Sequence, residues 1–281
     1  MKCFYHSSDL DGQCSGALIK MEYPECEMYG LDYGDDFPWD IIKQNETVFL
    51  VDFSLKPYIE TVYLAELLGN NFIWIDHHIS AMNTIETEYS KRNNGRINGI
   101  RRIGTAACEL TWEYLHPTKE IPTFVKLLGR YDVWDHSDPR TLPFQYGIKQ
   151  YDTSPESGIW IGVWFNNIVT GVIQEGETIL KYINRDYERN INKFAFDVDF
   201  DGYKCIAVNI PCANSRIFDG IGNKDQYDIM ITFGFQNGSW RIRLYSDKED
   251  IDITALATKY GGGGHKRAGG MICDVLPFEL K

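Results

Sequence analysis

The stretch NNFIWIDHHIS, residues 70–80, joins an apolar run to three ionisable side chains. Phe72–Ile75 has the length and composition of a buried strand. The chain then passes directly into Asp76, His77 and His78. Three ionisable groups in succession at the end of a buried strand are costly to desolvate unless they bind something. The stretch therefore predicts a strand that ends in a binding site.

Two further apolar runs end in residues of the same kind. His6, Asp9 and Asp11 follow a predicted strand at 3–5, and Asp52 follows a predicted strand at 47–51. In a parallel sheet the carboxyl ends of the strands lie on one edge, where ligand crevices form. These acids and imidazoles are therefore expected to meet on one rim of a sheet.

A fourth contribution comes from GRYDVWDH, residues 129–136, which follows a predicted helix at 122–131. Asp132 and Asp135 compete for this role on sequence grounds. Each acid taken singly also has a simpler explanation as a turn residue or a helix N-cap, and His6 taken singly as a packed or exposed histidine. Asp9 and Asp11 alone would suit the start of a helix, where negative charge is favourable. The joint occurrence at strand ends favours a metal site.

The spacing of the apolar runs predicts an α/β fold. Strands are expected at 3–5, 26–31, 47–51 and 72–75, with helices at 15–22 and 56–68 between them. This alternation indicates a mostly parallel sheet with helices on both faces. Later helices are expected from an N-cap at Thr105 to residue 115, at 122–131 and, as a connector, at 172–193.

From about residue 200 the pattern changes to that of a second, smaller domain. Strands are expected at 205–210, 229–235 and 240–245, and Asn237-Gly238 is a strong hairpin signal. A helix is expected at 253–260, before four glycines. We predict a first domain at 1–195, which includes the connector helix, and a mixed α/β domain at 200–281.

Composition limits which binding partners and which cell compartment are expected. The net charge of −12 disfavours long nucleic acid, whose binding depends on neutralising phosphates, but allows a small phosphate ligand in a local cationic pocket. The seven cysteines include no Cys-x-x-Cys pair, so neither structural zinc nor a disulfide framework is expected. No signal peptide and no apolar run of membrane-spanning length is seen, which predicts a cytoplasmic protein without a membrane partner.

Carboxylates and imidazoles in this combination favour Mn²⁺, with Mg²⁺ as the alternative. The charges favour two ions, because Asp9, Asp11, Asp52 and Asp132 supply four negative charges and two divalent cations balance them. Without metal these carboxylates would repel one another, and some would protonate.

The motifs resemble those of the DHH phosphoesterase family, named after the tripeptide at 76–78. The first motif stands here as HSSDLDG, residues 6–12, followed by Asp52, the tripeptide and Asp132. The resemblance covers the whole chain, because GGGGHKRAGG at 261–270 is similar to the signature of the companion DHHA1 domain. One departure lies in the first motif, which has two residues between His6 and Asp9 where many members have three.

The resemblance implies a dinuclear site, usually of manganese. One ion would be held by His6, Asp9 and Asp52. The other would be held by Asp11, Asp52, His77 and Asp132, so that Asp52 bridges the two. Asp76 would orient the His77 ring, and His78 would face the substrate phosphate together with Arg267. Members of the family often form homodimers, so a homodimer is expected.

The glycine run of the second domain suits phosphate binding, because successive amides can form an anion nest. It lacks the Gly-Lys-Ser/Thr ending of a phosphate-binding loop. The alternative is a glycine-rich helix end with a solvated basic pair. A second segment, Asn214-Ser215-Arg216, matches a family position that faces the cleft. The expected substrate-binding residues are Gly262, Gly263, Gly264, His265, Arg267, Ser215 and Arg216.

The resemblance implies hydrolysis of a phosphoester, in which two ions activate water and stabilise the leaving oxygen. The spelling of the motifs is closest to the oligoribonuclease (nanoRNase) branch, whose members degrade very short RNA and in part remove the 3′-phosphate of 3′-phosphoadenosine 5′-phosphate. Aromatic residues, 14% of the chain, offer rings for stacking on one or two bases. Cyclic dinucleotide hydrolysis and a non-catalytic nucleotide sensor remain alternatives; pyrophosphatase and long single-strand exonuclease activity are disfavoured.

Overall fold

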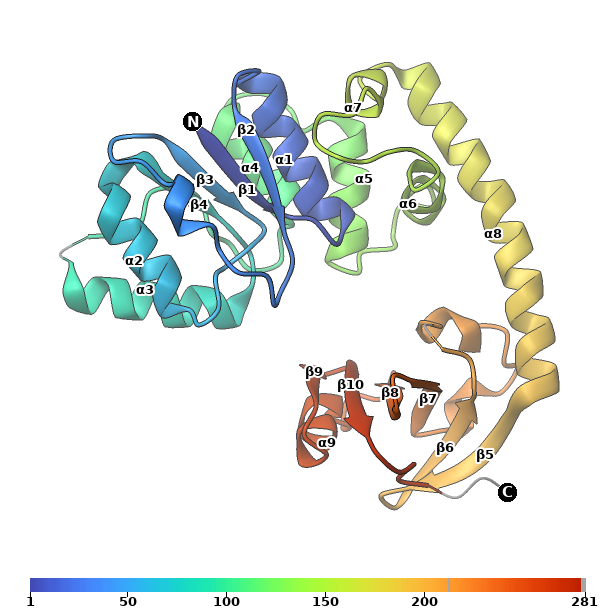
Figure 1. The fold of residues 1–281 in the computed structure, drawn as a ribbon. Helices are drawn as coiled ribbons and strands as arrows, with labels where there is room; N and C mark the ends of the chain where they lie inside the picture. The colour runs from blue at the N-terminus through green and yellow to red at the C-terminus, as the bar shows by residue number, and fades with distance from the viewer. Residues whose placement is uncertain (94, 212, 279–281) are drawn as a thin grey trace. The chain divides into compact units, whose positions relative to one another are not determined.

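A computed structural model describes residues 1–93, 95–211 and 213–278 of the chain. The chain divides into two compact units, Met1–Ile179 and Leu180–Lys281, whose boundary falls inside the long helix α8 (Asn166–Phe194). Figure 1 shows the ribbon of each unit. From the sequence we placed the whole connector helix in the first domain. The domain boundary at 195–200 stays a prediction.

The first unit is built on a four-stranded parallel sheet. Its strands are β2 (Glu27–Leu31), β1 (Lys2–His6), β3 (Val48–Val51) and β4 (Phe72–Ile75), in that order across the sheet. Every neighbouring pair is parallel. The predicted parallel sheet is confirmed, and the carboxyl ends of all four strands lie on one edge.

Helices cover both faces of this sheet, as predicted. Phe4, Leu50 and Trp74 form one buried row and pack against α2 and α3, whereas their neighbours Cys3 and Phe49 face α1 and α4 (Figure 1). The helices of this unit are α1 (Leu10–Glu22), α2 (Ile59–Leu68), α3 (Ile79–Arg92), α4 (Ala107–Leu115), α5 (Thr123–Asp132), α6 (Thr141–Ile148) and α7 (Ile159–Gly162). Short 3-10 turns lie at Trp39–Ile41 and Gly69–Asn71.

One helix was not predicted and one local expectation was wrong. Helix α3 was not predicted, because only Ala81 and Ile85 of its residues are buried and its apolar stripe is therefore narrow. Thr105 does not cap α4, which starts at Ala107 with Ala106 in the cap position and without a side-chain cap from that residue. The N–H groups of α4 have another acceptor, described below.

The second unit is a mixed α/β unit, as expected, and its sheet has six strands, of which β5, β9 and β10 were not predicted. Its strands are β5 (Ala195–Phe200), β6 (Tyr203–Val208), β7 (Ile229–Gln236), β8 (Ser239–Tyr245), β9 (Gly263–His265) and β10 (Ala268–Cys273), in the order β5-β6-β7-β8-β10-β9. β6 and β7 are parallel and the other pairs antiparallel. Asn237 and Gly238 both have positive φ, at 54° and 84°, which confirms the predicted hairpin. Helix α9 (Ile253–Lys259) and 3-10 turns at Ser215–Phe218 and Lys224–Gln226 complete the unit.

Two properties of the chain follow from the described residues. None of the helices there is both long enough and apolar enough to cross a bilayer. The cysteines in the same ranges carry free thiols, and all but Cys273 are buried.

Candidate metal centre

Three strand ends bring their polar residues together around Asp52. This residue follows β3, has a positive φ of 54° and is only 1% exposed. His6, the last residue of β1, places Nδ1 3.7 Å from one carboxylate oxygen of Asp52. His77, two residues beyond β4, places Nε2 3.4 Å from the other oxygen. Asp52 therefore lies between two imidazoles that come from the two neighbouring strands.

Asp9 joins the His6 side of this cluster. Its carboxylate caps α1 by accepting the N–H of Gly12 at 2.9 Å, and its other oxygen lies 2.8 Å from His6 Nδ1. Gly12 is required here, because a Cβ atom would lie 2.1 Å from the carbonyl oxygen of His6. The short loop between His6 and Asp9 thus still brings the two side chains together. Asp9 is both the helix cap and a member of the cluster.

Asp11 lies in the first turn of α1 and is held by the start of α4. Its two oxygens accept the backbone N–H groups of Ala107 at 2.8 Å and Cys108 at 2.7 Å. These are N–H groups that a helix leaves without partners, so a carboxylate from a distant segment does the work expected of Thr105. One oxygen also lies 3.7 Å from His77 Nε2.

Asp132 supplies the last member on the His77 side. It is the final residue of α5, and its Oδ2 lies 3.4 Å from His77 Nε2. Asp135, its competitor from the sequence, accepts the N–H of Ser137 and lies 3.7 Å from Arg130 Nε. Of the two acids, Asp132 is the one that contacts the cluster.

Among the described residues, three overlapping groups have the geometry to hold a metal ion. They are His6, Asp9 and Asp52; Asp11, His77 and Asp132; and Asp52, His77 and His78. The first two groups contain all six residues expected as ligands, and Asp52 lies 3.4 Å from His77 of the second group. The six side chains therefore form one continuous cluster.

The hydrogen bonding of these side chains fits a cation. His6 Nδ1, Asp52 Oδ1 and Asp132 Oδ2 are buried and have no hydrogen-bond partner. His6 Nδ1 lies 2.8 Å from an Asp9 oxygen without the alignment of a hydrogen bond. Buried polar atoms are rarely left unpaired. Oxygen and imidazole atoms that converge in this way without pairing are the donor set of a hard or borderline divalent ion.

The cluster also shifts the pKa values of its members in the metal-free protein. Burial, and then the charge of Asp52, raises the pKa of Asp11 to about 7. Burial and the charge of Asp11 likewise raise the pKa of Asp132 to about 7. Burial opposes protonation of His77, but the carboxylates of Asp52, Asp11 and Asp132 close to its ring outweigh it and raise its pKa to about 10. The carboxylates thus need positive charge, which protons supply when metal does not.

The Asp-His-His tripeptide differs from the expected arrangement in one contact. Asp76 is fully buried, and its Oδ1 lies 2.7 Å from Nδ1 of the His78 ring. The same oxygen accepts the backbone N–H groups of His77 at 2.7 Å and His78 at 3.1 Å. The resemblance implied that Asp76 orients the His77 ring, whereas the ring that it contacts is that of His78.

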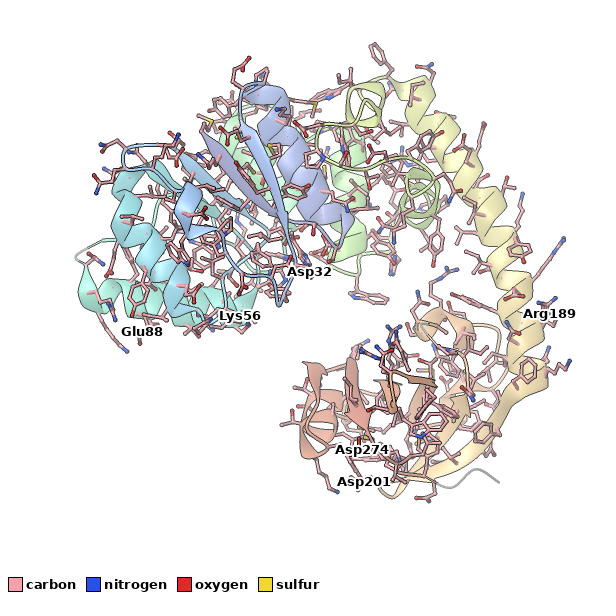
Figure 2. The ribbon with its side chains drawn as sticks, viewed as in Figure 1. Asp32, Lys56, Glu88, Arg189, Asp201 and Asp274 are labelled. Carbon is pink, nitrogen blue, oxygen red and sulfur yellow. The ribbon has the colours of Figure 1, made fainter. Side chains whose placement is uncertain are left out.

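A residue that the sequence reasoning missed lies beside His6. Asp32 follows β2 directly, and its Oδ1 lies 3.4 Å from His6 Nε2. Figure 2 labels Asp32 at the lower end of the sheet. The signal was present, because an Asp after the predicted strand at 26–31 repeats the pattern of the other strand ends. Asp32 thus contacts Nε2 of the His6 ring, whereas Asp9 contacts Nδ1.

In the second unit, the glycine run is partly a strand. Gly263–His265 forms β9 and pairs with β10, and a Cβ atom at Gly262 would lie 2.1 Å from the carbonyl oxygen of Gly270. Gly264 has a φ of 149° and would meet the carbonyl oxygen of Ala268 at 2.4 Å. These glycines therefore permit close strand packing, which favours the structural explanation for part of the run. The side chain of His265 lies outside the described part of the chain.

The two predicted arginines already have protein partners. Arg267 forms an exposed ion pair with Glu249. Arg216 donates from Nη2 to the Asn184 side chain at 2.9 Å, and its backbone N–H donates to Asn214 at 3.1 Å. Ser215 begins the 3-10 turn that Asn214 caps, and Arg216 lines a hollow of about 320 Å³.

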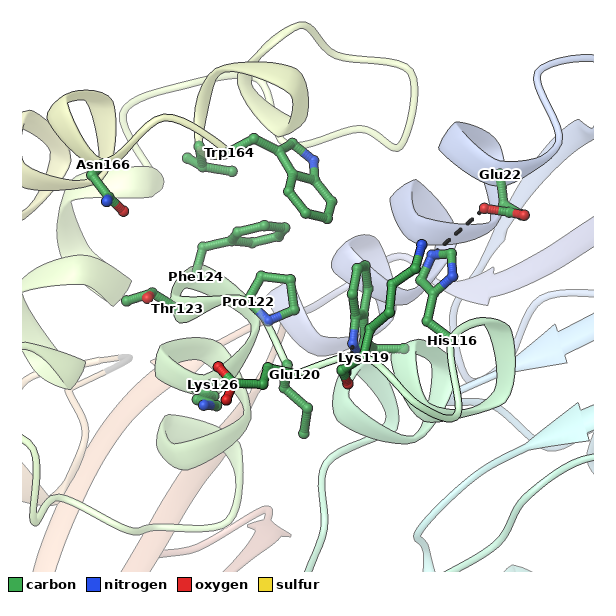
Figure 3. Close-up of a pocket in the computed structure, with 13 residues that line it drawn as sticks. Glu22, His116, Lys119, Glu120, Pro122, Thr123, Phe124, Lys126, Trp164 and Asn166 are labelled. Carbon is green, nitrogen blue, oxygen red and sulfur yellow. Dashed lines mark hydrogen bonds and ion pairs between the residues drawn. The ribbon is translucent and has the colours of Figure 1, made fainter.

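A larger hollow of about 610 Å³ lies elsewhere in the first unit (Figure 3). It is lined by Trp112, Phe124 and Trp164, and by the pair His116–Glu22, whose atoms lie 3.5 Å apart. Glu22 ends α1 and Phe124 lies at the start of α5, whereas the cluster takes Asp11 from the start of α1 and Asp132 from the end of α5. The hollow is therefore separate from the candidate metal centre.

Comparison with known proteins gives several relatives along the chain. No family model matches it. An uncharacterized protein of Acanthamoeba polyphaga mimivirus is 28% identical across 84% of this chain, which spans 56% of that protein's length. The oligoribonuclease NrnB of Bacillus subtilis is 23% identical, with 98% of this chain and 74% of NrnB covered. The bifunctional oligoribonuclease and PAP phosphatase NrnA of Mycoplasma pneumoniae is 22% identical, with 95% and 86% covered.

A solved structure shares the fold. The pGpG-specific phosphodiesterase PggH of Vibrio cholerae superposes with a TM-score of 0.56 at 15% identity, covering 97% of this chain and 92% of that one. At this identity the likeness shows the fold alone. The family motifs stand in the expected order, their residues meet at one sheet edge, and the relatives cover almost the whole chain. In its motifs, its fold and its relatives the chain is similar to the DHH phosphoesterases.

Proposed function

We propose that this protein is a metal-dependent phosphoesterase that hydrolyses short oligoribonucleotides or small nucleotide phosphoesters through two divalent ions, most suitably Mn²⁺. The observation that carries the proposal is the position of Asp52. It lies within 3.7 Å of both His6 and His77, which belong to separate groups of candidate ligands. A carboxylate shared by two such groups is what a dinuclear site requires.

The described residues divide naturally between the two ions. His6, Asp9 and Asp52 would hold one, and Asp11, His77 and Asp132 would hold the other with the second oxygen of Asp52. Bound ions would lower the pKa of a coordinated water and stabilise the leaving oxygen of the phosphoester. The four carboxylates Asp9, Asp11, Asp52 and Asp132 carry charge that two divalent ions neutralise, which lets a phosphate approach.

His78 is the side chain proposed to contact the reacting phosphate. Its ring is partly exposed, and Nδ1 is engaged by the fully buried Asp76, which leaves Nε2 for a phosphate oxygen. Burial opposes protonation of the ring, but the hydrogen bond to Asp76 outweighs it and raises the pKa of His78. A protonated imidazole donates to a developing oxyanion. Asp76 acts as a positioning residue for this ring.

The second unit is proposed to bind the substrate phosphates. Arg216 is held by Asn184, so a bound phosphate would meet a side chain of restricted freedom. Arg267 would exchange its exposed partner Glu249 for phosphate, and a surface ion pair of this kind contributes little to stability. The backbone of Gly262, Gly263 and Gly264, together with Ser215 and His265, completes the proposed substrate-binding set.

Short substrates are favoured over long ones. Two relatives are named as oligoribonucleases, and one of them also as a PAP phosphatase. The net charge of −12 opposes long nucleic acid, whose affinity depends on phosphate neutralisation. The cytoplasm is the proposed location of this activity. A homodimer stays a prediction from the family.

The deciding experiment is product analysis with a panel of substrates. End-labelled RNAs of two to five nucleotides, 3′-phosphoadenosine 5′-phosphate, pGpG, a cyclic dinucleotide and a long RNA are incubated with protein and Mn²⁺. We expect stepwise release of mononucleotides from the short RNAs, loss of activity in EDTA, and little cleavage of the long RNA. Preferential opening of the cyclic dinucleotide would instead favour the alternative phosphodiesterase. Asp52→Asn serves as the inactive control.

A non-catalytic nucleotide sensor is the alternative from another class. It predicts that the protein binds these nucleotides without turnover in the presence of either Mn²⁺ or Mg²⁺. Binding measured together with product formation therefore separates the two functions. Retention of full hydrolysis by Asp52→Asn would remove the catalytic assignment altogether.

A further inference from the structure

We propose that Trp134 is a stacking platform for a nucleobase of the substrate, next to the candidate metal centre. The inference rests on the proposed function and goes beyond it, because it names the residue that recognises the nucleoside part. Trp134 lies two residues after Asp132, whose carboxylate is 3.4 Å from His77. A base stacked on this indole would therefore lie next to a phosphate held at the cluster.

Trp134 is the most exposed tryptophan among the described residues. It is 67% exposed, against 44% for Trp164 and 38% for Trp39, whereas Trp74, Trp112 and Trp160 are at most 4% exposed and belong to the cores. An indole has a large apolar surface that normally drives it into the interior. An indole left in water keeps an apolar face that a planar ligand can cover.

The backbone under Trp134 is fixed in an unfavourable conformation. Its φ is 60°, which residues with bulky side chains rarely adopt. Successive hydrogen bonds hold this turn, from the N–H of Trp134 to the carbonyl oxygen of Tyr131 at 3.2 Å and from the N–H of Asp135 to that of Arg130 at 2.8 Å. Asp135 in turn accepts the N–H of Ser137 at 2.9 Å. Strain of this kind persists where the surroundings impose it, commonly at functional sites.

The ring contacts of Trp134 leave room for a base. Its ring centroid lies 5.5 Å from that of His136, at an interplanar angle of 88°. An edge-to-face contact of this type occupies at most one face of the indole. Among the described residues this is the ring–ring contact that Trp134 makes, and its 67% exposure leaves surface for a planar ligand.

Tyr33, the exposed aromatic residue at the other end of the cluster, does not offer the same surface. Its ring is stacked on Phe53 at 4.8 Å and contacts His6 at 5.4 Å, so its face is used to support a candidate ligand. Trp134 is therefore the better platform of the two. The contrast also gives a direction, with the recognised nucleoside on the Asp132 side of the phosphate.

Stacking on an indole suits the proposed substrates. Every nucleobase has a π face, so a single aromatic platform binds short RNA without selecting a sequence. The ligand class that fits both the ring and the neighbouring metal site is a nucleotide.

The test compares dinucleotides with and without bases. For r(ApA) in Mn²⁺, Trp134→Ala is expected to raise KM roughly tenfold and to change kcat less than twofold. Trp134→Phe retains a ring and is expected to restore most of the affinity. For the analogue that lacks both bases, KM is expected to be the same in wild type and Trp134→Ala. Phe165→Ala removes an equally exposed ring, 61% exposed, at the start of α8 and serves as the matched control.

A second variant separates recognition from structure. Trp134→Gly removes the strain at positive φ, so it is expected to raise the thermal midpoint while it raises KM for r(ApA). Unchanged KM in the Ala variant, an equal loss on the base-free analogue, or a change in oligomeric state would overturn the inference. Wild-type protein that fails to cleave r(ApA) would instead remove the proposed function, so the two failures are distinct.

Discussion

The carboxylate of Asp11 accepts the backbone N–H of Cys108 at 2.7 Å, across 97 residues of sequence. This bond ties the first turn of α1 to the first turn of α4, and a second bond from Ala107 strengthens it. The same carboxylate lies 3.7 Å from His77. One buried side chain thus closes a helix end and contributes to the candidate metal centre, which joins the stability of the unit to its proposed chemistry.

The double role of Asp11 predicts a stability loss that is independent of metal. In EDTA, Asp11→Ala should lower the free energy of unfolding by about 1–2 kcal/mol, because the α4 amides lose their acceptor. Urea denaturation measures this. Asp132→Ala is the control, since it should abolish activity without that loss; its removal relieves repulsion between buried acids. An Asp11→Ala protein as stable as wild type in EDTA would contradict the capping role.

The shifted pKa values predict how the metal-free protein responds to pH. Asp11 and Asp132, with pKa values raised to about 7, contribute stability that is full below pH 3.8 and is lost as the pH rises through about 7. His6 and His77 contribute stability that is full below pH 6.5 and is lost through about pH 10. All four act in the same direction.

The thermal midpoint in EDTA should therefore fall from pH 5 to pH 8. Added Mn²⁺ should raise the midpoint more at pH 8 than at pH 5, because at pH 8 fewer protons compete with the metal for the imidazoles and carboxylates. Scanning calorimetry at both pH values checks this. A midpoint that rises with pH in EDTA would show that the cluster is not the electrostatic centre described here.

The two acids of GRYDVWDH should behave differently when each is neutralised. Asp132→Asn is expected to reduce kcat by at least a hundredfold, because it contacts His77, whereas Asp135→Asn is expected to leave it within a few-fold. Steady-state rates on r(ApA) with saturating Mn²⁺ provide the comparison. An equal loss of kcat in the two variants would contradict the assignment of Asp132, and not Asp135, to the cluster.

Asp76 is expected to act through His78. Asp76→Asn should lower kcat about 10–100-fold, in the range seen when a supporting hydrogen bond is lost. Because Asp76 raises the pKa of His78, the alkaline limb of the kcat profile should move to lower pH in this variant. In a His78→Gln background the same change should have almost no further effect. A profile that does not move would mean that Asp76 has only a structural role.

Much of this arrangement could be predicted from the sequence. Buried parallel strands read as continuous apolar runs, and the residues after them must share an edge, so His6, Asp52 and His77 could be placed together. The hairpin at Asn237-Gly238 carries its own backbone preference. Helix α3 could not be predicted, because its exposed surface weakens the apolar periodicity that marks a helix.

The remaining features depend on contacts between distant segments. No local pattern shows that Asp11 caps α4, because capping is ordinarily done by the residue next to the helix. The resemblance favoured Asp132 over Asp135, but the residues alone left the two open, because the contact with His77 depends on where α5 ends. The partner of Asp76 depends on the path of a tight turn, where one residue decides which ring is reached.

The most direct test is anomalous diffraction from crystals grown with Mn²⁺, recorded at the manganese edge. The account predicts two peaks in the first unit, one among His6, Asp9 and Asp52 and the other among Asp11, His77 and Asp132, with Asp52 contacting both. Crystals of Asp52→Asn under the same conditions should show at least one peak weakened or lost. Saturating Mn²⁺ with no peak at this sheet edge would contradict the account.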